Sequence, residues 1–168
     1  EISRAIPRMK ILGAKFIRIM SYKVLDQEDQ LVDERIRRLR LIVEAFSNEG
    51  ITAVHENCMN YGGMSWRHTL DLVEAIPGMK LVFDTANPAF NRDRSKPGEP
   101  WQNPIEFYKK VREHIVYVHI KDCLSPSPEN QNKEIYTYPG EGHGCVWEIL
   151  QDLKAVSYTH LRAHETLP

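Results

Sequence analysis

Residues 51–85 read ITAVHENCMNYGGMSWRHTLDLVEAIPGMKLVFDT, and this stretch decides the fold. The apolar, β-branched run Ile51–His55 predicts a strand, and Met79–Phe83 predicts a second one. Between them, apolar residues recur at helical spacing in a segment that begins at Ser65 and stops at a Pro-Gly pair. The stretch therefore predicts a strand–helix–strand unit whose two strands run parallel.

The same alternation continues on both sides of this unit. Asn103 and Pro104 are residue types expected at the N-cap and first turn of another helix. The further predicted elements are a strand at 14–19, a helix at 32–46, a helix from 103, a strand at 115–118 and a short helix at 146–153. Four βα units in a row predict an α/β fold with a parallel sheet and right-handed crossovers. An open doubly wound sheet and half of a (β/α)8 barrel both fit, although the lack of a glycine-rich phosphate loop disfavours a nucleotide-binding open sheet.

The overall composition predicts a globular, cytoplasmic protein. Hydrophobic residues make up 42% and charged residues 27% of the 168 residues, a balance typical of a folded domain. The net charge of -1 gives no reason to expect a nucleic acid or an anionic membrane as a partner. No apolar run approaches the roughly 20 residues of a transmembrane helix. The three cysteines are widely spaced, which disfavours a disulfide framework and favours a reducing compartment.

A potential metal ligand follows each of three successive predicted strands. These residues are Glu56, Asp84 and His119. Because the C-terminal ends of parallel strands share one edge of the sheet, we expect the three side chains to converge. Two carboxylates and one imidazole suit Mn²⁺, Mg²⁺, Co²⁺ or Zn²⁺ better than a softer metal. Acids and histidines also end strands without binding any metal, but three in register favour a metal site.

The end of the chain departs from the βα pattern. Residues 156–166 read VSYTHLRAHET, have no helical period and are dense in His and Thr. This run is similar to the translation of a transposon sequencing adapter, with a native polar tail as the alternative. We therefore expect a partial barrel domain at 1–155 and a non-native tail at 156–168, and we assign no metal site to His160 and His164.

Four short motifs occur together, in this order and at about these spacings, in one known family. The motifs are Val54-His55-Glu56-Asn57, Val82-Phe83-Asp84-Thr85, Val118-His119-Ile120-Lys121-Asp122 and Pro139-Gly140-Glu141-Gly142. Through them the chain resembles the xylose isomerase-like barrels, a group that holds sugar phosphate isomerases and epimerases, inosose-type dehydratases and endonuclease IV. The resemblance implies a (β/α)8 barrel in which the four predicted strands are strands four to seven. It also implies that Glu56, Asp84 and His119 bind the metal, and that the first three strands and a fourth ligand on strand eight are missing from this fragment.

The resemblance also draws attention to residues around the three ligands. Asn87 stands where many relatives have a histidine, and Glu141 lies in a loop that approaches the site in relatives. Asn57, Lys121 and Asp122 adjoin the ligand motifs. We expect these five residues to contact the substrate or to support the ligands. A salt-bridged strand end is the alternative for Lys121 and Asp122, and a solvated turn is the alternative for Glu141.

The function implied by the resemblance is a metal-dependent isomerisation or epimerisation of a sugar or sugar phosphate. Glu56 would act as an acid/base group that moves a proton through an enediolate. A keto-inositol (inosose-type) dehydratase and a non-catalytic sugar-binding barrel are the alternatives. A nuclease is disfavoured, because Asn87 and Tyr136 stand where the endonuclease branch has metal-binding histidines. We expect a small-molecule sugar as the partner, no activity of the fragment alone, and leave homo-oligomerisation open.

Overall fold

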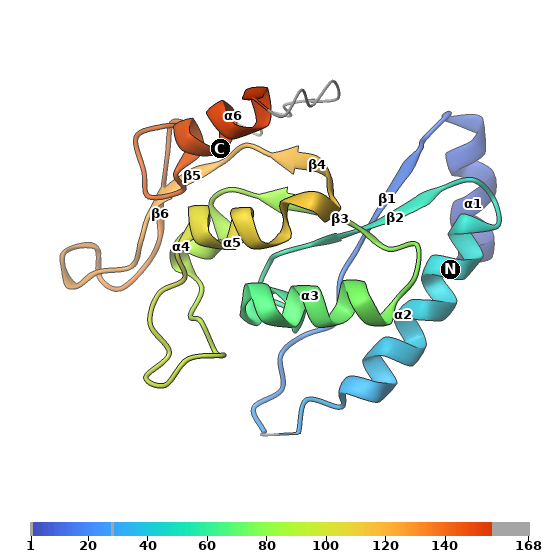
Figure 1. Cartoon of the computed structure of the whole chain (residues 1–168), viewed down its shortest axis with the longest axis horizontal. Coiled ribbons are helices and arrows are strands. Elements are labelled where there is room, and N and C mark those ends of the chain that lie inside the picture. Colours follow the sequence, from blue (N-terminus) through green and yellow to red (C-terminus); the bar gives the residue numbers. More distant parts are fainter. Residues whose placement is uncertain (1, 28, 156–168) are drawn as a thin grey trace.

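The computed structural model describes residues 2–27 and 29–155 and has a parallel four-stranded sheet at its centre (Figure 1). The strands are β1 (Phe16–Ile19), β2 (Thr52–Glu56), β3 (Lys80–Asp84) and β4 (Ile115–His119). They lie side by side in the order β1-β2-β3-β4, each parallel to the next. A doubly wound sheet reverses its strand order at a switch point, whereas a barrel keeps its strands in chain order. The observed order is that of part of a (β/α)8 barrel, which confirms the predicted fold.

The helices of the βα units lie where the sequence pattern predicts them. The structure has α1 (Ile2–Ile11), α2 (Val32–Ser47), α3 (Trp66–Ala75), α4 (Asn87–Phe90), α5 (Pro104–Val111) and α6 (Val146–Ala155), with 3-10 turns at 62–64, 112–114 and 128–130. Ser65 caps α3, because its side chain accepts a hydrogen bond from the backbone N–H of His68. Asn103 caps α5 in the same way through the N–H of Glu106. These caps fix where the two central helices begin.

Two large apolar clusters attach α2, α3, α5 and α6 to one face of the sheet, and a third, smaller one holds α1 beside α2. One cluster joins β1 and β2 to α2 and α3 and includes Ala53 and Leu72, each fully buried. The other joins β3 and β4 to α5 and α6 and includes Phe83, whose ring meets that of Phe107 edge-on at 5.7 Å. Burying such side chains contributes roughly 1.5–3 kcal/mol each. The helices are therefore held on the face that would be the outside of a barrel.

The opposite face of the sheet carries Arg18 and the three predicted metal ligands. Successive strand side chains point to opposite faces. Because Ile19, Phe83 and Val118 pack toward the helices, their neighbours Arg18, Asp84 and His119 point the other way. Figure 1 shows α3 and α5 on the same side of this sheet. The predicted ligands thus lie on the face that would line the interior of a barrel.

Some elements lie where the sequence pattern predicts none. They are α1, the single turn α4, and an antiparallel hairpin made of β5 (Asp122–Leu124) and β6 (Ile135–Thr137). The hairpin strands have only three residues each, which is too short for a periodicity to be recognised. The hairpin follows β4 directly and so extends from the strand end that carries His119.

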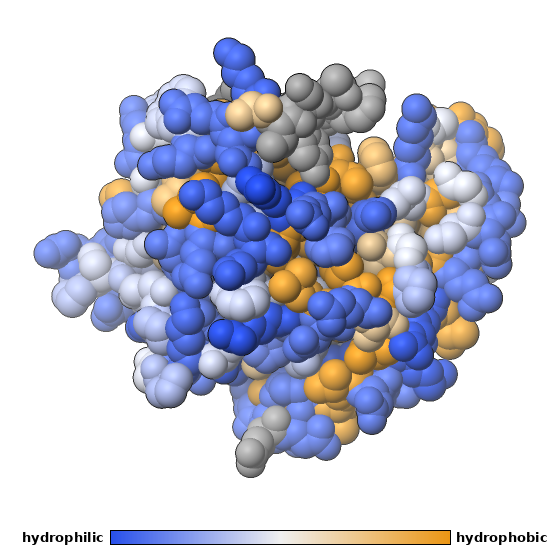
Figure 2. Space-filling view, viewed as in Figure 1, coloured by the Kyte–Doolittle hydropathy of each residue, from blue (hydrophilic) through white to orange (hydrophobic). Residues whose placement is uncertain are grey.

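The outer surfaces of the helices are largely hydrophilic, with hydrophobic atoms visible in the seams between them (Figure 2). Within residues 2–27 and 29–155, no helix combines the length and apolar character needed to cross a bilayer. Cys58, Cys123 and Cys145 are free cysteines in the structure. The predicted tail at 156–168 lies outside the described residues, so its adapter-like character stays a prediction.

We expect Gly63→Ala to lower the melting temperature of the protein, because the 3-10 turn before α3 has no room for a side chain. A Cβ at Gly63 would come within 1.7 Å of the carbonyl oxygen of Cys58. The turn cannot easily move, since the Gly63 carbonyl accepts a 2.8 Å bond from Gln102. The expected cost is about 2–3 kcal/mol, measured by thermal or denaturant unfolding.

Gly98→Ala is the matched control for this substitution. Gly98 has a φ of +74° but nothing lies within 4 Å of a Cβ there. It should cost only the backbone strain of a left-handed residue, about 1 kcal/mol. Equal losses for the two variants would show that the close approach to Cys58 is unimportant.

Candidate functional site

Three potential metal ligands converge at one edge of the sheet. Glu56, Asp84 and His119 are the last residues of β2, β3 and β4. Each offers one ligand atom, and these atoms all lie within 4.8 Å of one another. Glu56 is 2% exposed and Asp84 is completely buried, while His119 is partly exposed. The parallel register produces this convergence, since Asp84 pairs directly with His119.

Glu56 is held by two positively polarised groups. Nδ1 of His119 lies 3.0 Å from Oε1 of Glu56, and Nη1 of Arg18 donates a 2.9 Å hydrogen bond to Oε2. This contact is a hydrogen bond to an ionised carboxylate when Nδ1 of His119 carries the proton, since a carboxylate can only accept. Burial raises the pKa of Glu56, but the bond from His119 and the charge of Arg18 outweigh burial and bring the pKa below its ordinary value. Glu56 is therefore ionised at neutral pH.

The two oxygens of Asp84 have different surroundings. Oδ1 accepts hydrogen bonds from the backbone N–H groups of Ala86 at 3.0 Å and Asn87 at 3.1 Å. Oδ2 is buried and has no aligned hydrogen-bond donor among the described residues, although Nζ of Lys121 lies 2.9 Å away. The two observations agree if Lys121 acts as a charge placed near Oδ2 rather than as a directional donor. Burial lowers the pKa of Lys121, but Asp84 outweighs burial and raises it, so the ammonium stays charged.

This donor set fits a divalent cation. A buried carboxylate oxygen without a hydrogen bond is costly unless a cation approaches it. Oδ2 of Asp84 has no aligned hydrogen bond among the described residues, has the Lys121 ammonium beside it, and faces an ionised carboxylate and an imidazole, so a metal ion could take the place of that ammonium. Two oxygens and one nitrogen are suitable ligands for Mn²⁺, Mg²⁺, Co²⁺ or Zn²⁺. Glu56, Asp84 and His119 could therefore hold such an ion together.

Asn57 supports the ligands from behind. Its side chain donates a 3.0 Å hydrogen bond to the carbonyl of Asp84 and accepts a 2.7 Å bond from the N–H of Asp84. This two-point contact fixes the end of β3 against the end of β2. Asn57 is 4% exposed, so its amide serves the backbone of a predicted ligand. Asn87 is 7% exposed and supports Asp84 through its backbone N–H.

Asp122 is placed beneath a loop and organises it. Its two carboxylate oxygens accept four backbone N–H groups at 2.8–3.0 Å. The donors are Cys123, Gly140, Gly142 and Gly144. A Cβ at Gly142 would come within 2.4 Å of Oδ1, so glycine is needed for this close approach. Asp122, which is 1% exposed, shapes the loop that follows β6.

We expect Asp122→Asn to destabilise this loop. Asn has one acceptor oxygen, so its NH₂ group would face two backbone N–H groups that now donate to Asp122. Leaving buried donors unpaired costs about 1–3 kcal/mol each, and we expect a total loss of about 2–3 kcal/mol in unfolding free energy. The exposed Asp71→Asn on α3 is the control and should cost under about 0.5 kcal/mol. A loss no larger than that of the control would contradict this role.

Two further residues near the strand ends differ in whether they contact the predicted ligands. Glu141 is exposed, and among residues 2–27 and 29–155 no hydrogen bond or ion pair links its side chain to Glu56, Asp84 or His119. Arg18 contacts Glu56 although the sequence analysis did not single it out. The signal was present, because Arg18 is a lone charge inside the apolar run Phe16–Ile19. A single charged residue within an apolar strand indicates that its side chain lies on the sheet face that carries the metal ligands.

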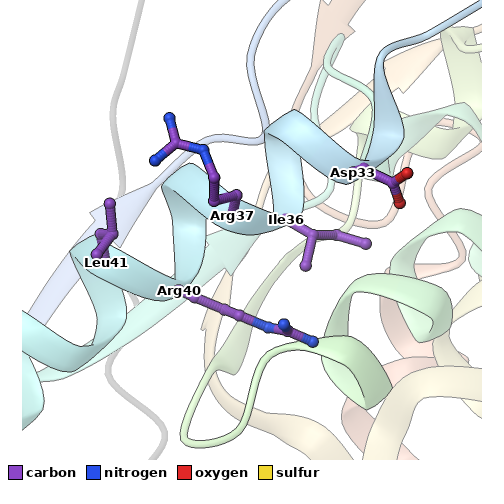
Figure 3. A pocket seen from close by; sticks show the side chains of 5 residues that line it. All are labelled: Asp33, Ile36, Arg37, Arg40 and Leu41. Carbon is purple, nitrogen blue, oxygen red and sulfur yellow. The ribbon is translucent and has the colours of Figure 1, made fainter.

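A surface hollow of about 430 Å³ lies away from this site. Figure 3 shows that its walls come from α2 alone. The lining residues are Asp33, Ile36, Arg37, Arg40 and Leu41. None of them is at a strand end, and the hollow contains no convergent group of ligand atoms.

Fold and site together define a parallel α/β barrel protein with a carboxylate–histidine cluster at the C-terminal strand edge. A family model described as the xylose isomerase-like TIM barrel matches residues 1–167. The chain therefore belongs to the xylose isomerase-like TIM barrel family. This confirms the resemblance drawn from the four motifs. No curated protein matches the chain.

Solved structures of the same fold agree with this assignment. A xylose isomerase domain protein from Planctomyces limnophilus is 20% identical with a TM-score of 0.78, over 98% of this chain and 56% of that one. A xylose isomerase-like TIM barrel protein from Mycobacterium smegmatis in complex with magnesium is 16% identical with a TM-score of 0.73, over 99% and 60%. A D-tagatose 3-epimerase-like protein is 22% identical with a TM-score of 0.70, over 95% and 58%. The chain thus spans less than two thirds of each of these structures.

Proposed function

We propose that the protein is a metal-dependent isomerase or epimerase of a sugar or sugar phosphate. The observation that carries the proposal is the convergence of ligand atoms of Glu56, Asp84 and His119 within 4.8 Å. An epimerase-like protein and a magnesium complex among the similar structures support the same class of function. A cytoplasmic location and the absence of a nucleic acid partner stay predictions.

The residues of the site would divide the work. A bound divalent metal would supply Lewis acidity, which makes a C–H beside a sugar carbonyl more acidic. Glu56, ionised and held by Arg18 and His119, would accept the proton from that carbon. It would deliver the proton to the neighbouring carbon in an isomerisation, whereas an epimerisation would need a second acid/base group on the opposite face of the sugar. Asp84 would contribute charge to the ion and no proton transfer. Asn57 would keep Asp84 in register with Glu56.

Deuterium exchange tests this proposal. The intact protein is incubated with ketoses, their phosphates or keto-inositols in deuterated water, with Mn²⁺, Mg²⁺, Co²⁺ or Zn²⁺. NMR should show deuterium at the carbon next to the carbonyl, together with an isomer or epimer. Exchange followed by loss of water would identify the dehydratase variant. Binding of a sugar with no exchange under any metal would leave only the non-catalytic barrel.

A further inference from the structure

The ammonium group of Lys121 lies beside the Asp84 oxygen that a bound metal ion would also contact. Its ammonium nitrogen lies 2.9 Å from Oδ2 of Asp84. Oδ1 of Asp84 is already occupied by two backbone N–H groups, so Oδ2 is the oxygen left for a cation. The ammonium and a divalent metal ion would therefore compete for one carboxylate oxygen.

The way in which Lys121 is held makes it replaceable. Its contact with Oδ2 is short but not aligned as a hydrogen bond, whereas Arg18 makes an aligned 2.9 Å bond to Glu56. The Lys121 side chain is 34% exposed, so the ammonium can swing toward solvent when another cation approaches Asp84. A long side chain of this kind keeps its stem packed while its charged end moves.

We infer that Lys121 is a positioning residue that competes with the metal for Asp84 and thereby limits metal affinity. The inference rests on the metal site of the proposed function. Lys121 neutralises a fully buried carboxylate, and it lies close enough to repel a divalent ion at the same oxygen. Lys121 thus stabilises the site when no metal is bound and lowers its affinity for metal.

The test is a calorimetric titration of the intact protein with Mn²⁺ after chelator treatment. Lys121→Met should bind Mn²⁺ at least about tenfold more tightly than the unaltered protein, because the positive charge that repels the metal ion is gone. Lys121→Arg keeps the charge and should bind Mn²⁺ within about threefold of the unaltered protein. Lys80→Met, an exposed lysine at the other end of β3, is the matched control and should leave the affinity unchanged.

A second readout separates this role from a structural one. Without metal, Lys121→Met should melt at a lower temperature than the unaltered protein, since Asp84 loses its counter-ion. With Mn²⁺ the rise in melting temperature should be larger for Lys121→Met than for the unaltered protein. Lys121→Gln provides the same comparison if the Met variant does not fold.

The outcomes of the two experiments are distinct. Equal or weaker Mn²⁺ binding by the neutral variants, with normal binding by the unaltered protein, overturns the role of Lys121 and leaves the metal site intact. If neither the unaltered protein nor any Lys121 variant binds Mn²⁺, the metal site of the proposed function fails, and this inference fails with it. A tighter neutral variant supports both.

Discussion

Glu56→Gln should reduce deuterium exchange into the sugar by about 10²–10⁴-fold at saturating metal. Gln keeps the size of the side chain and one carbonyl oxygen that can accept from His119 or Arg18. It cannot take a proton from carbon. The loss should therefore appear in the turnover rate even when excess Mn²⁺ fills the site, and exchange measured by NMR is the direct readout.

Glu113→Gln is the control for this substitution. Glu113 is exposed and lies just before β4, at the opposite end of the strand that carries His119. It should exchange at the rate of the unaltered protein. If Glu56→Gln retains more than about a tenth of the exchange rate at saturating metal, Glu56 is not the proton-transfer group.

The fold could be predicted from the sequence because its central elements have unambiguous local signals. The strand at Thr52–Glu56 and the helix capped by Ser65 are both visible as a change of apolar period. What the period could not decide was the order of the strands. That order depends on how Leu72 and Phe107 bury against the sheet, which is a property of the packed chain.

The convergence of the triad could also be predicted, since parallel strands bring their last residues to one edge. The supporting contacts could not. Asn57 bonds the backbone of Asp84, and Asp122 accepts from the N–H groups of a distant glycine loop. Both partners lie 18 or more positions away in the chain, so no local pattern reveals them. The predicted roles of all these residues in catalysis stay predictions.

Asp84→Asn should weaken Mn²⁺ binding by at least about 100-fold, measured by calorimetry. Substitutions of residues that only orient a ligand cost about 10–100-fold, so loss of a ligand oxygen should reach at least the upper end of that range. The asymmetry of Asp84 adds to the effect. If the Asn carbonyl takes the place of Oδ1 and accepts from Ala86 and Asn87, its NH₂ group must point at the site and at Lys121. A donor in that place repels a metal ion.

The opposite orientation of the Asn side chain is also unfavourable. With the carbonyl toward the site, the NH₂ group would face the N–H groups of Ala86 and Asn87, and two buried hydrogen bonds would be lost. Asp84→Asn should therefore recover part of its exchange activity in excess metal, whereas Glu56→Gln should not. Asp71→Asn on the outer surface of α3 is the control and should bind Mn²⁺ normally. A calorimetric affinity for Asp84→Asn within threefold of the control would mean that Oδ2 of Asp84 is not a ligand.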